Sequence, residues 1–323
     1  MSTADNGGAT YLVDASVYIF RYYFALPPNW ESRSGYSTEA VYGFTNFLLD
    51  LLARKPLRIA CAFDESLGSC FRNDLYPDYK CSRALPDEAL AYQLAACREM
   101  AEALGIASFA SERFEADDIL ATLTGLCATQ QPAIAPVVIT RDKDLGQLLD
   151  RGAQSLWDFA ADQYLDRAVI EAKFGVRPAQ IADFLALVGD SIDDIPGVPG
   201  IGAKTASRLL AEFADTELLI ANATEIATLK IRGARSIAAK IADHADQIRL
   251  ARQLAQLEYR VPLNVEPDDL RWQAADIEHA VALADEYGLG RLQSKIRRTL
   301  PNLGQRLEDG QSTPEENTFL ENP

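Results

Sequence analysis

Three short apolar runs in the first half of the chain each end on an acidic residue. They are residues 10–14 (TYLVD), 57–64 (LRIACAFD) and 136–142 (PVVITRD). Runs of this length, bounded by polar segments, are typical of buried strands. Between these runs, apolar residues recur with the spacing of helices. Thr38 can cap a helix that continues to Arg54, and Pro86 can open a helix that ends before Gly105. Strands alternating with helices predict an α/β fold with a mostly parallel, doubly wound sheet.

From about residue 166 the strand pattern stops and helical spacing continues to residue 300. A chain of 323 residues, 48% of them hydrophobic, is long enough for two lobes. We therefore expect an α/β domain followed by a smaller helical domain, with a flexible start and a disordered, Glu- and Asn-rich end. The expected boundaries are 1–9, 10–175, 176–300 and 301–323.

Composition narrows the class of protein. Five cysteines without a C-x-x-C pair, and only two histidines, predict a cytoplasmic protein with reduced thiols, no zinc site and no histidine-based catalysis. No apolar stretch approaches the roughly 18 residues of a membrane span. The net charge of −16 argues at first against a nucleic-acid partner. Basic residues nevertheless gather locally, at Arg72, Lys80 and Arg83 and at Lys204, Arg208, Arg232, Arg235 and Lys240.

Nine acidic residues are candidate metal ligands, because they follow predicted strands, precede a predicted helix or lie in a loop. They are Asp14, Asp64, Glu115, Asp117, Asp118, Asp142, Asp144, Asp190 and Asp193. Ligands of such sheets bind beyond the carboxyl ends of the strands, where three of these acids fall. Converging carboxylates repel one another without cations, and an oxygen-only set favours Mg²⁺ or Mn²⁺ over zinc. The alternative is a set of helix caps and solvated loop residues, and for Asp118 alone the two interpretations are balanced.

The segment 189–208 (GDSIDDIPGVPGIGAKTASR) places glycines and prolines ahead of a predicted helix. The glycines Gly197, Gly200 and Gly202 leave backbone N–H groups accessible, and Lys204 adds a positive charge. Such a turn at a helix start can hold a DNA phosphate without reading the base sequence. The alternative is a purely structural Gly-Pro turn.

These motifs together resemble one family, the bacterial and phage 5′ nucleases related to flap endonucleases and to the amino-terminal nuclease domain of bacterial DNA polymerase I. The resemblance covers nearly all of residues 10–300. It rests on LVDASVYIFRYYFALPP (12–28), AFDE (62–65), FRNDLYPDYKCSR (71–83), EADD (115–118), TRDKDLGQL (140–148) and the 189–206 run. The chain looks like a freestanding nuclease of this family, with a helical arch over residues 79–111 and a helix-three-turn-helix in its second domain.

The resemblance also implies roles for particular residues. The acids at 14, 64, 115, 117 and 118 look like one metal cluster, and those at 142, 144, 190 and 193 like a second. It further implies that Lys80 and Arg83 grip the scissile phosphate, that Arg21 assists, and that the carbonyls of Val198 and Ile201 can bind K⁺.

Other residues in the same motifs carry weaker expectations. Arg72 is a candidate DNA contact, and Tyr79 either stacks on an unpaired base or packs within the arch. Two positions depart from the family pattern, since Arg141 replaces a usual glycine and Asp194 a common asparagine.

The sequence therefore predicts a two-metal, structure-specific 5′ nuclease with 5′-3′ exonuclease and flap endonuclease activity in DNA replication or repair. We expect it to act as a monomer on DNA with 5′ flaps, branches or single-stranded ends. One competing class is the haloacid-dehalogenase-like phosphatases, suggested by VGDSIDDI (188–195), but Ser16 stands where that family needs a second acid. Another is a non-catalytic binder of branched DNA that uses only the glycine-rich turn.

Overall fold

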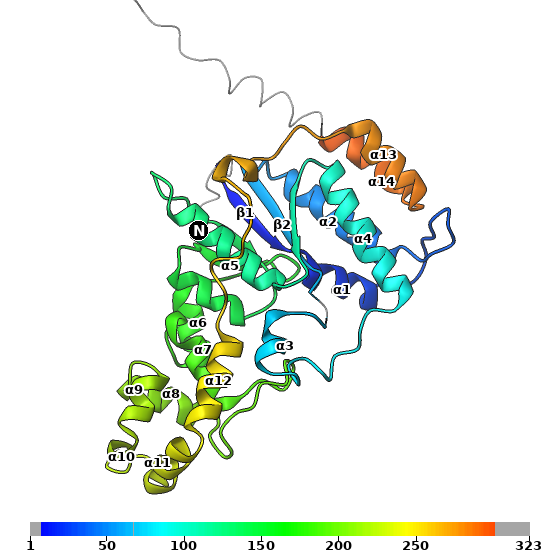
Figure 1. Cartoon of the computed structure of the whole chain (residues 1–323). Helices are drawn as coiled ribbons and strands as arrows, with labels where there is room; N and C mark the ends of the chain where they lie inside the picture. Colours follow the sequence, from blue (N-terminus) through cyan, green and yellow to red (C-terminus); the bar gives the residue numbers. More distant parts are fainter. Residues whose placement is uncertain (1–7, 67, 301–323) are drawn as a thin grey trace, which may run out of the picture.

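The computed structural model describes residues 8–66 and 68–300, and six strands in this range form one sheet (Figure 1). Neighbouring strands are parallel except for the final antiparallel pair, β5 and β6. The spatial order is β3-β2-β1-β4-β5-β6, which confirms the predicted mostly parallel, doubly wound α/β class. The strands are β1 (Thr10–Asp14), β2 (Arg58–Asp64), β3 (Ala107–Ser111), β4 (Val137–Ile139), β5 (Ser155–Asp158) and β6 (Gln163–Leu165).

Helices cover both faces of the sheet because consecutive strand residues point to opposite sides. In β1, Tyr11 and Val13 pack into the core that contains α1, α2 and α4, whereas Leu12 packs into the core that contains α5. The strands β2 and β4 divide between the same two cores, so their near-continuous apolar sequences are buried on both faces. The helices of this lobe are α1 (Ala15–Ala25), α2 (Glu39–Leu52), α3 (Phe71–Leu75), α4 (Glu88–Ala103) and α5 (Ala116–Ala128).

Residues 88–111 do not form an arch, which corrects the expectation for that segment. Helix α4 packs on α2, with Cys97 and Met100 fully buried, and β3 pairs with β2 from Ala107 onward. The sequence of β3, ASFAS, has too few apolar residues to be recognised as a strand beforehand. The chain between β2 and α4 instead crosses the carboxyl edge of the sheet as turns and the single short helix α3.

The second lobe is helical and shares its core with the α5 face of the sheet. Helices α7 and α12 are packed together at its centre, and the buried Asp183 of α7 ties them to the start of α9. Its carboxylate accepts from the Thr216 N–H at 3.0 Å and from Arg252 Nε at 2.8 Å. The elements are η1 (Asp144–Asp150), α6 (Arg167–Phe174), η2 (Pro178–Gln180), α7 (Ile181–Val188), α8 (Ala203–Glu212), α9 (Thr216–Ala221), α10 (Ala223–Ile226), α11 (Ala234–Asp243), α12 (Ala245–Ala255) and η3 (Pro267–Leu270).

The last two helices leave this lobe and return to the sheet, contrary to the expected domain end at residue 300 (Figure 1). Helix α13 (Ile277–Glu286) packs on α4, and α14 (Gly290–Thr299) packs on α2. Trp272 is 5% exposed, and its indole N–H donates to the Leu104 carbonyl at 2.9 Å. The helical lobe is thus connected to the first lobe at both of its ends.

Two expectations concern residues outside the described range. They are the flexible start at 1–9, of which only residues 8 and 9 are described, and the disordered tail at 301–323. Among the described residues, no helix is both long and apolar enough to span a bilayer.

Candidate active site

The site begins where the strand order reverses, between the carboxyl ends of β1 and β4. Asp14 ends β1 and caps α1, accepting the Val17 N–H at 3.3 Å. Thr140, just after β4, donates its hydroxyl to Asp14 Oδ2 at 2.8 Å, and the same hydroxyl accepts the Asp142 N–H at 2.9 Å. One threonine therefore fixes two acids on neighbouring strands. Such a reversal point is where open α/β sheets bind their ligands.

Two more elements bring acids to this edge. Asp64 ends β2, where its N–H donates to Ser16 Oγ at 2.9 Å and its carboxylate accepts the Ser66 hydroxyl at 2.9 Å. Glu115 caps α5, and Asp117 lies in its first turn, where the helix dipole favours negative charge.

A further set of acids faces α5 across a small cavity of about 30 Å³. The Asp144 N–H donates to Asp142 Oδ1 at 2.8 Å. The backbones of Asp190 and Ile195 bond to each other in both directions, at 2.9 and 2.8 Å, which closes a tight loop that carries Asp193. The cavity brings acids of both expected clusters together, namely Glu115, Asp117, Asp142, Asp144, Asp190 and Asp193.

Burial and mutual repulsion make these carboxylates hard to ionise. Burial, with the nearby Asp142, raises the pKa of Asp14 to about 7. Burial, together with Asp142 and Asp190, raises the pKa of Asp144 to about 7 as well. The pKa of Asp117 is also raised, first by burial and then by Asp142 and Asp14. Crowded carboxylates of this kind favour the binding of a cation.

The residues present fit a hard divalent cation by their chemistry, since oxygen atoms are its preferred ligands. Within the described ranges, however, no three His, Cys, Asp or Glu side chains lie in an arrangement that could hold a metal ion as they stand. Several of the carboxylates instead form ion pairs with lysine or arginine, or accept hydrogen bonds from hydroxyl groups. The assignment of metal ligands therefore stays a prediction.

Lys80 and Arg83 reach the site from the loop that precedes α4. The Lys80 ammonium contacts Glu115 Oε1 and lies 3.5 Å from Asp193 Oδ2. Arg83 Nη2 lies 2.5 Å from Asp193 Oδ1. Burial alone would raise the pKa of Glu115, but Lys80 and Arg72 outweigh it and hold that pKa below its usual value. The two predicted phosphate-gripping cations thus lie beside the acids, as the prediction requires.

Arg72 and Asp118 form a buried ion pair. Arg72 donates from Nη1 and Nη2 to both Asp118 oxygens, at 2.7 and 2.8 Å, and the side chains are 2% and 0% exposed. Arg72 also donates to the Leu254 and Gln256 carbonyls, at 2.8 and 2.9 Å. Each side chain is therefore satisfied inside the protein, and the expected roles of Arg72 in DNA contact and of Asp118 in metal binding stay predictions.

Tyr79 is 3% exposed and packs within the protein, yet it also lines a cavity beside the acids, so its stacking on an unpaired base stays a prediction. Its hydroxyl donates to Glu115 Oε2 at 2.9 Å. Further aromatic groups come from α1, where Phe20, Tyr23 and Phe24 line the same cavity, which has a volume of about 690 Å³. Sequence reasoning missed them, although their spacing along one helix face was visible in the quoted FRYYF segment.

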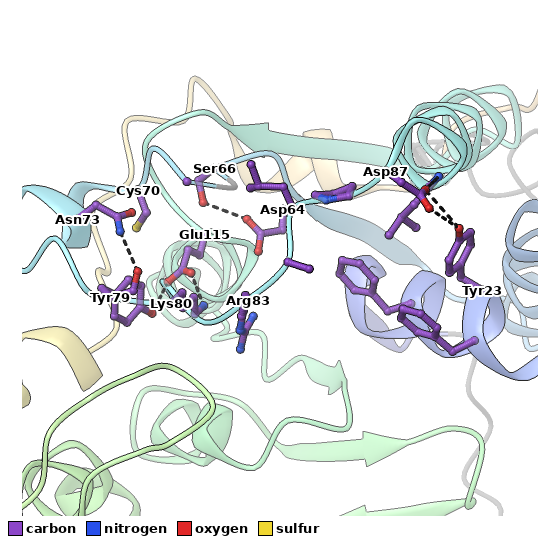
Figure 2. A pocket seen from close by; sticks show the side chains of 17 residues that line it. Tyr23, Asp64, Ser66, Cys70, Asn73, Tyr79, Lys80, Arg83, Asp87 and Glu115 are labelled. Carbon is purple, nitrogen blue, oxygen red and sulfur yellow. Dashed lines mark hydrogen bonds and ion pairs between the residues drawn. The ribbon is translucent and has the colours of Figure 1, made fainter.

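This cavity opens beside the acids and the two cations (Figure 2). Asp64, Lys80, Arg83 and Glu115 form its polar side. Its other side is apolar, and two of its residues are strongly exposed, Phe24 at 77% and Leu85 at 70%. An apolar, aromatic surface next to acids and cations suits a ligand that has both flat rings and phosphates.

The glycine-rich turn connects α7 to α8. Gly197 packs so tightly that an added Cβ would lie 2.4 Å from the Val188 carbonyl, so only glycine fits. Gly200 has a φ of +79°, whereas Gly202 is the N-cap residue that precedes α8 and has open space around it. Lys204 is exposed in the first turn of α8, where helix N–H groups lack internal partners.

Val198 and Ile201, the expected K⁺ ligands, have buried side chains in this turn. The Val198 carbonyl accepts the Ile201 N–H at 3.0 Å. The Lys240 ammonium donates to the Pro199 carbonyl at 2.8 Å, so a protein cation already lies at the turn.

Three remaining expectations concern single residues. Arg21 is partly exposed on α1 and does not line either cavity, although its neighbours Phe20 and Tyr23 line the larger one, and its catalytic role stays a prediction. Arg141 pairs with Asp158 at 3.2 Å on the surface. Asp194 adopts a φ of 54°, a left-handed conformation that aspartate tolerates, and it accepts the Ser82 N–H at 2.9 Å.

The fold and the acidic edge of the sheet define an α/β protein of the resolvase-like nuclease type, and comparison with known proteins identifies its family. Residues 9–175 match the 5′-3′ exonuclease N-terminal resolvase-like domain, and residues 176–278 match the 5′-3′ exonuclease C-terminal SAM fold. The chain therefore belongs to the 5′-3′ exonuclease family. The predicted class of enzyme and the resemblance on which it rested are confirmed.

Relatives agree with this assignment. DNA polymerase I of Rhizobium leguminosarum is 39% identical over 274 residues, which is 82% of this chain but only 26% of that protein. DNA polymerase I of Pseudomonas aeruginosa is 40% identical over 278 residues, or 85% of this chain and 30% of that protein. This chain thus spans less than a third of the length of these relatives. Among solved structures, T5 5′-exonuclease with bound zinc has the same fold, with a TM-score of 0.63, 18% identity and coverage of 92% of this chain and 98% of that one.

Proposed function

We propose that this protein is a metal-dependent 5′ nuclease that cuts DNA carrying an unpaired 5′ strand, with both 5′-3′ exonuclease and flap endonuclease activity. The observation that carries the proposal is the meeting, at one edge of the sheet, of buried acids, two cations and an aromatic cavity. Family membership, and the metal ions bound by T5 5′-exonuclease, support it.

Two Mg²⁺ or Mn²⁺ ions are the cofactors that these acids suit. Asp14, Asp64, Glu115 and Asp117 would hold one ion, and Asp142, Asp144, Asp190 and Asp193 the other. When bound, such ions lower the pKa of an attacking water and stabilise the leaving oxygen of a phosphodiester.

The protein groups would act on the scissile phosphate itself. Lys80 and Arg83 are placed to donate to its non-bridging oxygens and to offset the charge that develops there during in-line attack. Thr140 would keep Asp14 and Asp142 in register, since its hydroxyl bonds to both residues. The products would be a 5′-phosphate and a 3′-hydroxyl.

The large cavity supports an unpaired strand as the substrate. Its aromatic side chains from α1 present ring faces on which bases can stack, and this kind of stacking requires bases that are free of the duplex. The turn before α8, with Lys204 and the α8 N–H groups, would hold a phosphate of the adjoining duplex. K⁺ at the carbonyls of Val198 and Ile201 would support this contact.

Cleavage of end-labelled flap, nicked and blunt DNA with Mg²⁺, and then with EDTA, tests the proposal. We expect the flap to be cut fastest, with no cleavage in EDTA. Asp142→Asn should lower turnover by several orders of magnitude while it still binds the flap in Ca²⁺, since a metal ligand is lost and the DNA contacts remain. Cleavage in EDTA, or near-normal turnover by Asp142→Asn, would contradict the assignment.

A further inference from the structure

Lys80 is bound as a counter-ion to acids that belong to both proposed metal sites. Its ammonium contacts Glu115 and lies 3.5 Å from Asp193, and its side chain is only 18% exposed. The ammonium is therefore held between the two carboxylates.

The backbone holds Lys80 in this place. Its φ is 55°, a left-handed conformation that residues with a side chain rarely adopt. The Lys80 N–H donates to the Asp193 carbonyl at 3.0 Å, and two residues later the Ser82 N–H donates to Asp194 Oδ2 at 2.9 Å. Strain of this kind persists only where surrounding contacts enforce it, and here both contacts come from the acid-bearing loop after α7.

Arg83 forms a second ion pair with the acid-bearing loop after α7. Its guanidinium pairs with Asp193 Oδ1, while Lys80 faces Oδ2 of the same carboxylate. Two protein cations thus share one acid. A divalent ion bound by Glu115, or a second one bound by Asp193, would meet these cations at close range, where like charges repel strongly.

We propose that Lys80 is an internal counter-ion that competes with the divalent cation for Glu115 and Asp193, so that metal binding releases its ammonium toward the scissile phosphate. The proposal rests on the proposed function, since it assumes that these acids bind metal. The same lysine then serves two states of the enzyme. Without metal it neutralises the acids, and with metal it becomes available to the substrate.

Metal binding to the full chain without DNA tests this competition. Calorimetric titration with Ca²⁺ should show tighter binding to Lys80→Met, which keeps most of the side-chain length but lacks the charge. The expected gain is on the order of tenfold or more, from the removal of one close like charge. Lys80→Arg, which keeps the charge, should stay near the unaltered protein. The matched control is Arg113→Met, because Arg113 forms an exposed ion pair with Asp74 nearby in the chain.

Thermal unfolding gives a second readout in case Lys80→Met folds poorly without metal. Loss of the counter-ion removes one of the two cations that pair with Glu115 and leaves Arg72 as the other, so the variant should unfold at a lower temperature in EDTA and gain more from Ca²⁺ than the unaltered protein does. Equal or weaker Ca²⁺ binding by Lys80→Met, with an equal gain in unfolding temperature, would overturn the competition. If the unaltered protein and Lys80→Met both bind no Ca²⁺, the proposed metal site itself fails, which is a distinct outcome.

Discussion

The charged residues of the site are positioned in two ways, some by the strand that they follow and others by contacts with distant parts of the chain. Asp14, Asp64 and Asp142 follow apolar strands, and that local pattern is enough to predict that they share one edge of the sheet. Asp118 and Arg72 cannot be assigned in this way. Their roles depend on Leu254 and Gln256, more than 180 residues from Arg72 in the chain, and no local pattern signals such a contact.

Arg72→Ala should destabilise the protein strongly, because it leaves Asp118 buried and without its ion-pair partner. Breaking a buried pair by removing one member costs about 3–5 kcal/mol in the free energy of unfolding. Arg113→Ala is the control, since both members of the Arg113–Asp74 pair are more than half exposed, and we expect little or no loss of stability. Urea unfolding measures both values. A small loss for Arg72→Ala would mean that Asp118 finds another partner.

At the scale of elements, the sequence predicts the strands that are apolar and bounded by acids, and it misses the others. Strand β3 has small and polar residues, and β6 is three residues long and largely exposed, so their positions are set by pairing with neighbours. The sequence of α4 has helical spacing, and this spacing alone cannot distinguish a helix of an arch from a helix that packs on the sheet lobe. Its buried face against α2 becomes apparent only in three dimensions.

The turn before α8 allows a matched test of packing. Gly197→Ala would place a Cβ 2.4 Å from the Val188 carbonyl, so the turn must shift, at a cost of about 1–3 kcal/mol in stability. Gly202→Ala meets no atom within 4 Å and should change stability by less than about 0.5 kcal/mol. Urea unfolding of the two variants distinguishes them. Equal stabilities would show that the Gly197 backbone is less tightly packed than the structure indicates.

Contact between α8 and a DNA backbone can be tested through salt dependence. Lys204→Ala should weaken binding to duplexes of any sequence and reduce the slope of log affinity against log salt by about one phosphate contact. Arg291→Ala, an exposed cation on α14 of the first lobe, is the control and should leave the slope unchanged. An unaltered slope for Lys204→Ala would place the turn away from the DNA backbone.

For the whole molecule, the crowded acids make stability depend on pH. The pKa values of Asp14 and Asp144 are raised to about 7 in the folded protein, above those of the unfolded chain. The folded state therefore keeps protons that the unfolded chain releases, and the metal-free protein should lose stability as the pH rises from about 4 to about 7. Saturating Ca²⁺ should reduce this loss. Urea unfolding across that range, in EDTA and in Ca²⁺, measures it, and a metal-free stability that rises with pH would contradict the prediction.

The return of α13 and α14 to the sheet also decides how this chain can be divided. A fragment that stops at residue 271 would lack Trp272 and both helices, and would uncover the apolar faces of α2 and α4 that they bury. Such a fragment should aggregate, although it would retain every acid of the site. A fragment in which residues 176–271 are replaced by a short linker would keep these two helices, but it would uncover the core shared with the α5 face and would lose Asp190 and Asp193. The two lobes are nested rather than consecutive, so a cut at one position cannot separate them.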